Sequence, residues 1–281
     1  MKVFKWIAII LLVLIVTGTT LYLIYFRPFM QKMKETNIIT YDKELTIVLG
    51  GGGNSGILVS DSLVVVIDTK MDDAAEKLYQ NAKELAGNRP LLVINTHIHP
   101  DHTNGNKHYK GQTIIAGGNY KKENWIKEAG EETLPTEWLK GKMDIKMGDD
   151  TITLLNLGKI AHTESDIVVY LHKRKMLFAG DLVLNKQAPV LMGSADPDGY
   201  MAVFDLLPKQ FDIQKIVPGH GAIGGIELID NFRQYFIDMK TAAIDKSKEK
   251  ELVAKYKDWV QVPFFMSPGA TIDAIAKKMW P

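Results

Sequence analysis

Hydrophobic positions divide the chain into one long uncharged segment near the N-terminus and a series of short apolar runs after it. Residues 6–26 carry no charged side chain, and as a helix they would span roughly 30 Å, the thickness of the hydrocarbon core of a bilayer. Aromatic side chains lie at both ends of this segment, as is typical of membrane interfaces. The pattern therefore predicts one transmembrane helix within residues 1–27.

A cleaved secretory signal is the alternative for the same segment. Such signals have an apolar stretch of about 7 to 15 residues, followed by small residues at the cleavage site. Here the stretch is longer, and it ends in bulky side chains at 21–26. We therefore expect a single-pass membrane protein with its catalytic domain on the periplasmic or extracellular side. Basic residues flank both ends of the segment, so the charge pattern alone leaves orientation and cleavage open.

A polar linker is expected at 28–41, and beyond it apolar runs rich in Val, Ile and Leu alternate with amphipathic stretches. The runs predict strands at 44–50, 56–60, 63–69, 91–95, 151–157, 167–171, 176–179 and 215–217. One helix is predicted from Asp72 or Asp73 to Gly87, with Leu78, Ala82 and Leu85 on its apolar face. Further helices are predicted at 197–209 and within 226–259.

Strands and helices recur in both halves of the segment 42–281, which we expect to be the catalytic domain. This order of elements indicates an α+β fold in which two sheets pack face to face between outer helices, an αββα sandwich. A single domain of this size can bury an adequate core without disulfides.

Composition narrows the possible chemistry. Lys and Arg total 34 and Asp and Glu total 33, so no basic surface field is available to recruit nucleic acid, and none is expected as a partner. The chain has no cysteine, which excludes thiolate ligands and a cysteine nucleophile. Residues 51–56 match Gly-X-Gly-X-X-Gly, but a strand pattern follows them instead of a helix, so no dinucleotide cofactor is expected. Any metal must be bound by His and carboxylate side chains.

Four side chains of metal-ligand type lie within six consecutive positions, directly after the predicted strand at 91–95. They are His97, His99, Asp101 and His102. Side chains alternate in an extended chain, so His97 and His99 project to one side. A turn at the intervening proline can then present Asp101 and His102 to a second point nearby. This spacing predicts a metal site.

Three further candidates stand near the ends of predicted strands, each close to a glycine: His162, Asp181 and His220. Each of them alone would more often be structural. Two zinc sites, however, need about three protein ligands each in addition to solvent. Together with the four clustered side chains, these three complete a site for two metal ions.

These residues resemble the metallo-β-lactamase superfamily, whose His-X-His-X-Asp-His motif, later His, bridging Asp and final His occur here in the same order. The resemblance covers roughly residues 46–225 and implies two zinc ions per chain. The implied ligands are His97, His99 and His162 for one ion, Asp101, His102 and His220 for the other, and Asp181 bridging both; Asp101, His162 and His220 are also expected to be catalytic. Asp68 matches the family's strand-end Asp, which orients ligands.

The local sequence is most similar to the subclass B1 β-lactamases, at 161–171, 178–181 and 218–221. Two positions differ from that subclass. Asp181 stands where it has a metal-binding Cys, and Leu184 stands where it has a Lys that binds the substrate carboxylate; Lys186 is near enough to substitute. Residues 50–53 resemble in position the mobile hairpin loop that covers substrate. His99 replaces the Glu of the di-iron branch, which favours zinc, although another divalent metal stays open.

The function expected from these residues is that of a membrane-anchored zinc hydrolase. It would use a metal-bridging hydroxide to attack an amide, ester or thioester carbonyl of a small molecule, because zinc lowers the pKa of bound water to about 7. A β-lactam-like substrate is the leading expectation, and lactones and thioesters are the alternatives. A non-catalytic membrane-bound zinc protein is the competing class. Sequence leaves the substrate and the oligomeric state undecided.

Overall fold

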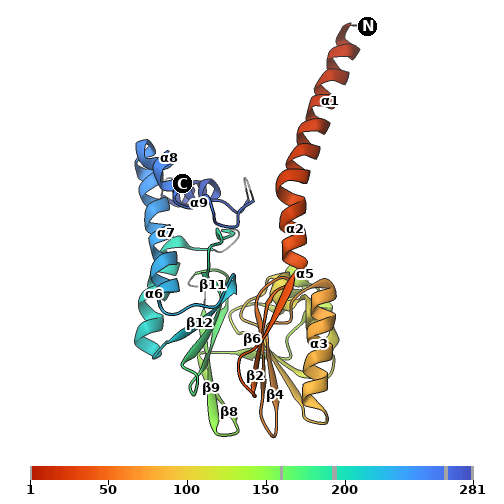
Figure 1. Ribbon diagram of the computed structural model, residues 1–281, viewed down its shortest axis with the longest axis vertical. Helices are drawn as coiled ribbons and strands as arrows, with labels where there is room; N and C mark the ends of the chain where they lie inside the picture. Colours follow the sequence, from red (N-terminus) through yellow and green to blue (C-terminus); the bar gives the residue numbers. More distant parts are fainter. Residues whose placement is uncertain (1, 159–160, 192–194, 263–264, 280–281) are drawn as a thin grey trace.

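Two β-sheets face each other in the computed structural model, which describes residues 2–158, 161–191, 195–262 and 265–279 (Figure 1). Met1 and Pro281, the outer limits of the predicted segments, lie outside the described residues. The larger sheet has seven strands in sequential order: β1 (Thr36–Thr40), β2 (Leu45–Gly50), β3 (Ser55–Val59), β4 (Val64–Ile67), β5 (Leu91–Ile94), β6 (Thr113–Gly117) and β7 (Glu137–Leu139). The smaller sheet has five strands in the order β12-β11-β10-β9-β8: β8 (Lys142–Met147), β9 (Asp150–Gly158), β10 (Asp166–Leu171), β11 (Met176–Leu184) and β12 (Lys215–His220).

Helices cover the outer faces of the sheets (Figure 1). Those of the first half are α3 (Asp72–Ala86), α4 (Pro100–Thr103), the 3-10 segments Asn104–Tyr109 and Glu131–Thr133, and α5 (Lys122–Ala129). Those of the second half are α6 (Pro197–Gln210), α7 (Glu227–Ile244), the 3-10 segment Lys246–Lys248, α8 (Glu249–Ala254) and α9 (Pro268–Met279). The mixed α/β architecture with two sheets is the one predicted from the sequence.

Hydrophobic packing between the sheets holds the sandwich together. Every residue of β4 and β5 is buried, as expected of strands covered on both faces. One apolar cluster joins Ile67 and Ile94 of the larger sheet to Val169 and Phe178 of the smaller one. On the outer face, α3 packs Leu78 and Ala82 against the sheet. Leu85, predicted on that face, is 40% exposed, because Ala86 occupies the buried position in the last turn.

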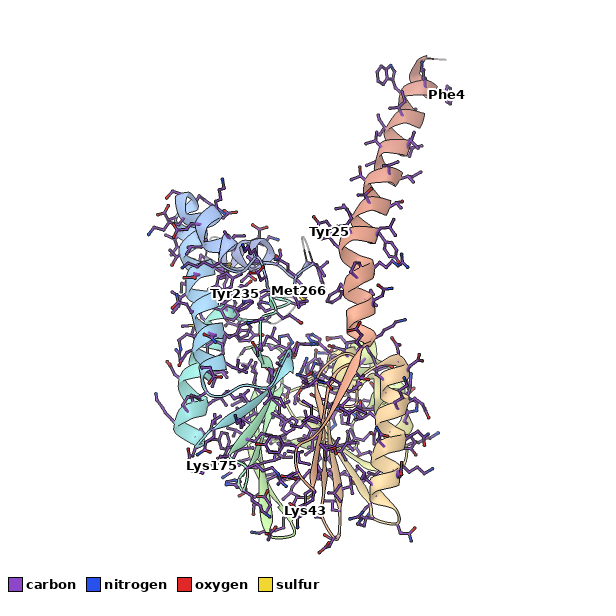
Figure 2. The ribbon with its side chains drawn as sticks, viewed as in Figure 1. Phe4, Tyr25, Lys43, Lys175, Tyr235 and Met266 are labelled. Carbon is purple, nitrogen blue, oxygen red and sulfur yellow. The ribbon has the colours of Figure 1, made fainter. Side chains whose placement is uncertain are left out.

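The N-terminal segment is one continuous helix that projects from the domain (Figure 1). It comprises α1 (Lys2–Leu21), a π-helical turn (Tyr22–Phe26) and α2 (Arg27–Lys34). The stretch Phe4–Gln31 is long and apolar enough to cross a membrane, and its most apolar window buries none of its residues against the domain. In Figure 2 the side chain of Phe4 lies far from the folded domain, whereas Phe29, in α2, packs against its hydrophobic core.

The polar linker predicted at 28–41 is instead ordered structure. Helix α2 continues to Lys34, and β1 then pairs with β2 in antiparallel register from Thr36↔Gly50 to Thr40↔Thr46. The short run Ile38-Ile39 supplies the β-propensity, and Ile39 packs against the inter-sheet core. Strands β6, β7 and β8 and helices α5 and α9 were also not predicted. Most of these elements are short. In β8, apolar positions alternate with charged ones, so no continuous apolar run marks the strand.

Candidate metal centre

Seven His and Asp side chains from distant parts of the chain meet at the edge of the sandwich from which α1 projects. The structure brings together every residue predicted for the metal site, in two adjacent groups. The first group is His97, His99, His162 and Asp181, and the second is Asp101, His102 and His220; within each group the potential ligand atoms lie within 4.8 Å of one another. Their convergence is observed, and their role as metal ligands stays a prediction.

Strand ends and turns place these side chains. His97 follows β5, the short helix α4 carries Asp101 and His102, and His220 is the last residue of β12. Asp181 was expected after the end of a strand, but it lies inside β11. The pairing register of β11 shifts on both sides of Gly180, whose φ is 53°. Such a bulge redirects the side chain that follows, and here it directs Asp181 into the site.

Three imidazoles and one carboxylate oxygen form the first group. His99 Nδ1 lies 3.1 Å from His97 Nε2 and 2.9 Å from His162 Nε2. Asp181 Oδ2 lies 3.6 Å from His162 Nε2. Tetrahedral zinc with bonds of about 2.0–2.1 Å separates neighbouring donor atoms by about 3.3 Å. The donor spacings in this group are close to that value.

The second group shares Asp181 with the first. His220 Nε2 lies 3.1 Å from Asp101 Oδ2, and His102 Nε2 lies 3.6 Å from the same oxygen. Asp181 Oδ1 lies 3.3 Å from His102 Nε2 and 3.5 Å from His220 Nε2. Because the other oxygen of Asp181 faces His162, one carboxylate oxygen faces each group. This is the geometry required of a carboxylate that bridges two cations.

Unpaired polar atoms test whether the site fits a metal. Among the described residues, His102 Nε2 and Asp181 Oδ1 are buried without a hydrogen-bond partner. Such atoms cost free energy unless something compensates them. A cation between them would compensate both, and a donor set of imidazoles and carboxylates suits zinc and other divalent first-row metals. The residues therefore fit a dinuclear metal site.

Asp68, directly after β4, orients two of the histidines. Its carboxylate is fully buried and accepts hydrogen bonds of 2.7 Å from the Thr96 backbone N, from Thr96 Oγ1 and from His102 Nδ1. Thr96 Oγ1 donates its only proton to Asp68, so it accepts from His97 Nδ1 at 3.1 Å. Protons on these Nδ1 atoms leave the Nε2 lone pairs of His97 and His102 directed into the site.

Tyr200 orients His162, a role that the sequence did not reveal. Its hydroxyl lies 2.8 Å from His162 Nδ1 and donates to the backbone oxygen of Asp181 at 3.2 Å. The hydroxyl oxygen therefore accepts from His162 Nδ1 and leaves Nε2 free for a metal. Tyr200 lies in the helix predicted at 197–209, more than thirty residues from His162 in sequence, and no local motif marks it.

Burial and charge separate the histidines into two electrostatic classes. Burial, reinforced by neighbouring imidazoles, lowers the pKa of His97 and His99, and it lowers the pKa of His162 to about 3. Burial also opposes the charged forms of His102 and His220, but nearby carboxylates outweigh it and raise their pKa values. For His102 these carboxylates are Asp68, Asp101 and Asp181, and for His220 they are Asp181 and Asp101. The histidines of the first group are thus neutral and ready to bind metal, whereas those of the second group bind protons more readily.

The glycine-rich loop at 50–53 forms a wall of the metal centre. It was expected to resemble a mobile hairpin, but Gly51, Gly52 and Gly53 are buried. The Gly53 backbone N donates to the backbone carbonyl oxygen of Asp101 at 3.0 Å, and a Cβ on Gly53 would overlap the His102 ring. Lys70 fixes the position of this loop. Its buried ammonium group donates hydrogen bonds to the backbone oxygens of Val48, Gly50 and Gly53.

Replacing Lys70 by methionine is expected to lower the free energy of unfolding by at least about 2 kcal/mol, because three buried carbonyl groups would lose their donor. Loosening this loop should also weaken metal binding through Asp101. Thermal denaturation and metal analysis measure the two effects. Lys122→Met, at an exposed position of α5, is the matched control. Equal stability of the two variants would contradict a structural role for Lys70.

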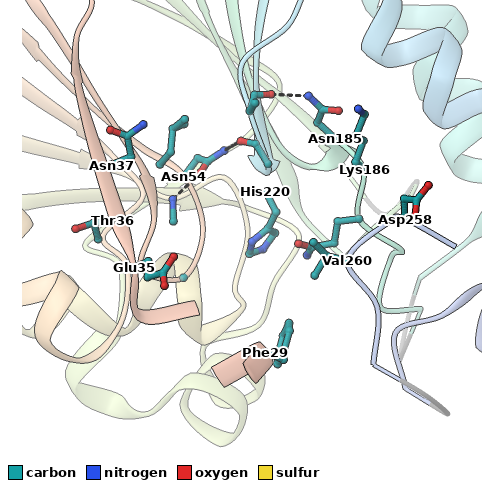
Figure 3. Close-up of a pocket in the computed structure, with 16 residues that line it drawn as sticks. Phe29, Glu35, Thr36, Asn37, Asn54, Asn185, Lys186, His220, Asp258 and Val260 are labelled. Carbon is teal, nitrogen blue, oxygen red and sulfur yellow. Dashed lines mark hydrogen bonds between the residues drawn. The ribbon is translucent and has the colours of Figure 1, made fainter. Parts of the chain in front are cut away.

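A cavity of about 600 Å³ opens beside His220 (Figure 3). Figure 3 shows Phe29 of α2 on one side of the His220 ring and Val260 on another. The glycine loop and β1 complete the wall opposite Lys186 and Val260. The second group of ligands therefore has access to a space large enough for a small-molecule substrate.

Leu184 does not lie on this cavity. It is 3% exposed and packs in the core with α6 and α7. The side chain at this position therefore does not face this cavity, because the extension of β11 places it in the core. Lys186 is exposed and lines the cavity. It is the basic side chain in a position to contact a substrate there.

The two-sheet fold and the His and Asp donor set are those of a metal-dependent hydrolase family, and comparison with known families identifies which one. The model of the metallo-beta-lactamase superfamily matches residues 48–220, more than half of the chain. The chain belongs to this superfamily. The resemblance recognised in the sequence motifs is thereby confirmed.

Curated relatives include two kinds of hydrolase. Human acyl-coenzyme A thioesterase MBLAC2 is 24% identical over 224 residues, which cover 67% of this chain and 80% of that protein. The metallo-beta-lactamase type 2 of Bacillus cereus is 29% identical over 175 residues, which cover 61% of this chain and 68% of that protein.

Solved structures share the fold. A metallo-beta-lactamase from Pontibacter korlensis aligns with a TM-score of 0.60 at 21% identity, covering 72% of this chain and 99% of its own. The inverting sec-alkylsulfatase Pisa1 from Pseudomonas sp. aligns with a TM-score of 0.70 at 13% identity, covering 88% of this chain and 51% of its own. At these identities the likeness establishes the fold alone.

Proposed function

We propose that this chain is a membrane-anchored, dinuclear zinc hydrolase that cleaves an ester, thioester or amide carbonyl. The observation that carries the proposal is Asp181, whose two oxygens face two separate groups of ligand atoms. In this assignment His97, His99 and His162 bind one ion, Asp101, His102 and His220 bind the other, and Asp181 bridges them. When bound, the two zinc ions lower the pKa of a coordinated water to about 7 and polarise a carbonyl group.

Some residues of the protein bind the metal ions and others orient the metal ligands. Asp68, Thr96 and Tyr200 fix the histidine rings, so the ligand atoms need little rearrangement. His220 faces the cavity, so a substrate entering there approaches the site from the side of the second group. Asp101 and His220 at that side, and His162 across the site, are the ligands that we assign to catalysis.

Lys186 supports the predicted β-lactam substrate. It is exposed on the cavity and can pair with a single carboxylate at hydrogen-bonding distance. The likeness to a metallo-beta-lactamase of Bacillus cereus points the same way, and the likeness to a thioesterase supports an acyl thioester. Both substrates place a carbonyl at the same metal centre, and so does a lactone.

Helix α1 supports the membrane anchor. Its apolar side chains are exposed along its described length. Exposing so large an apolar surface to water costs free energy. Placing the helix in a bilayer removes that surface from water. We assign the catalytic domain to the outer side of the membrane, as the sequence led us to expect.

A hydrolysis screen of the full-length, zinc-loaded protein tests the proposed function. The panel contains a cephalosporin, an acyl lactone, an acyl thioester, an acyl ester and a phosphodiester. Turnover of at least one carbonyl substrate that is lost on metal chelation and restored by zinc supports the proposal. Turnover of the phosphodiester alone contradicts it. Two bound zinc ions without turnover of any substrate would favour a non-catalytic zinc protein.

Acidification is expected to release the zinc bound by Asp101, His102 and His220 first. Protons compete with a metal for an imidazole at pH values below its pKa, and the pKa values of His102 and His220 are raised whereas that of His162 is lowered. The second site should therefore lose affinity at a higher pH than the first. Metal content after dialysis at decreasing pH measures this order, and His97→Ala and His220→Ala variants assign each loss. Simultaneous release of both ions would contradict it.

A further inference from the structure

The membrane helix and the active-site cavity share a side chain. Phe29 lies in α2, the direct continuation of α1, and it is half-buried against the hydrophobic core of the second half. The same side chain lines the 600 Å³ cavity beside His220 (Figure 3). On its other side α2 contributes Met30 and Lys34 to a second cavity of about 460 Å³. The end of the anchor is thus part of the wall of the substrate site.

This arrangement fixes the distance between the cavity and the bilayer. The uncharged segment ends at Phe26, and Phe29 follows three residues later, so the cavity wall begins about 4.5 Å beyond the apolar segment along a helix. Head groups occupy roughly 5–7 Å on each side of the hydrocarbon core. With α1 in a membrane, Phe29 therefore lies at head-group depth, where the acyl carbonyls of amphiphiles also lie.

The C-terminal helices provide a second surface on the same side. In Figure 1 the end of α7 and helices α8 and α9 rise from the sandwich in the same direction as α1. Ile244 at the end of α7 is 59% exposed, and Phe265, before α9, is 46% exposed. Several exposed lysines lie close to Ile244 in sequence: Lys246, Lys248, Lys250, Lys255 and Lys257. Carboxylates pair with three of these lysines, so this surface carries both signs of charge and adds mainly its exposed apolar side chains to the membrane-facing side.

Charged side chains around the cavity limit the charge that the head group of a substrate can carry. Glu35 and Asp258 line it, and Lys186 is the cationic side chain among its described lining residues. Two carboxylates at the rim repel a head group that carries several phosphates. Phe29, Leu49 and Val260 offer apolar surface to an acyl chain. The lining thus favours an acyl chain with a neutral head group.

We infer that the substrate is a long-chain acyl ester with an uncharged head group, which enters the cavity from the membrane past Phe29. This inference rests on the proposed hydrolase function and its membrane anchor. It selects the ester over the β-lactam among the proposed substrates, because Glu35 and Asp258 outnumber Lys186, the cation with which a β-lactam carboxylate would pair. The oxygen of water adds to the acyl carbonyl carbon, and the bond from that carbon to the alcohol oxygen breaks. One proton of the water goes to the departing alcohol, and the acid product ionises. The alcohol leaves through the solvent side, and the fatty acid returns to the bilayer.

Moving the cavity away from the membrane tests the inference. Seven polar, helix-forming residues inserted between Phe26 and Arg27 add two helical turns, about 10.5 Å, and nearly preserve the orientation of α2. The same seven residues inserted between Lys5 and Trp6, at the opposite end of the apolar segment, are the matched control. Zinc-loaded full-length proteins in phosphatidylcholine vesicles are assayed with 4-nitrophenyl butyrate, which is soluble, and 4-nitrophenyl palmitate, which partitions into the vesicles.

The insertion after Phe26 is expected to lower kcat/KM for the palmitate ester at least tenfold and to leave that for the butyrate ester within twofold. The control insertion should change neither. Equal rates on the palmitate ester, or equal loss on both esters, would overturn entry from the membrane. So would a wild-type preference for the soluble ester or for an acyl thioester of a polyphosphorylated alcohol. Failure of the zinc-loaded wild type on every carbonyl substrate would instead contradict the proposed hydrolase function.

Discussion

Replacing Asp181 by alanine is expected to reduce bound zinc from two ions per chain towards one and to lower kcat on the order of 10²-fold or more. The first site would keep His97, His99 and His162, which is a complete set of three neutral ligands. The second would lose the oxygen that lies 3.3 Å from His102 Nε2 and 3.5 Å from His220 Nε2. Two cations about 3.5–4 Å apart also repel strongly, and the carboxylate is one of the few negative charges between them.

Asp181→Cys is the matched control for this experiment. A thiolate restores one anionic ligand but offers a single donor atom, so we expect it to retain more metal than alanine does. Metal analysis by mass spectrometry, together with circular dichroism to confirm folding, distinguishes the variants. Two ions retained in Asp181→Ala, or one tightly bound ion in the wild type, would contradict a bridging role for Asp181.

Local sequence indicated that the candidate ligands converge, because their spacing marks them, and their role as ligands stays a prediction. His97, His99, Asp101 and His102 fall within six residues, so the turn that follows β5 brings them together without help from distant contacts. His162, Asp181 and His220 carried weaker signals, and they were assigned because the first cluster was incomplete alone. Buried strands such as β4 and β5 were equally clear, since their residues are uniformly apolar.

Features that depend on distant contacts could not be predicted. Lys70 looks like an ordinary surface residue, and only the folded chain shows its ammonium group donating to the carbonyl oxygen of Val48 and to two carbonyl oxygens of the glycine loop. Tyr200 reaches His162 from a helix that begins at Pro197. Leu184 was matched to the Lys of the β-lactamase subclass by sequence position alone, and the folded chain places its side chain in the core. Phe29 was assigned to a linker, whereas tertiary packing makes it part of the cavity wall.

The linker prediction was wrong for a related reason. Polar residues at 34–37 and 40 suggested a linker without a strand, but the edge of β2 offers unpaired backbone groups that β1 satisfies. This pairing follows directly after α2, so no flexible segment separates the N-terminal helix from the domain. A rigid connection is what allows the depth of the cavity at a membrane to be deduced from the helix.

Replacing Asp68 by asparagine is expected to weaken zinc binding at the second site about 10- to 100-fold while leaving the protein folded. Asp68 has a φ of 55°, a conformation that asparagine tolerates better than most residues, so the backbone should be retained. The amide oxygen can still accept from the Thr96 backbone N. Its NH₂ group, however, would replace Oδ2, the acceptor that now lies 2.7 Å from His102 Nδ1 and also 2.7 Å from Thr96 Oγ1.

An amide donor at that position would favour the His102 tautomer with an unprotonated Nδ1 and a proton on Nε2, the atom that faces the site. A protonated Nε2 cannot bind a metal, so the second site should lose affinity although its ligands are all present. Competition with a zinc chelator measures the affinity, and nitrogen chemical shifts of His102 report the tautomer. Asp166→Asn, which alters a buried carboxylate hydrogen-bonded to the backbone N of His162, is the comparison for the first site. Unchanged zinc affinity in Asp68→Asn would show that the tautomer of His102 is set by the metal itself and not by Asp68.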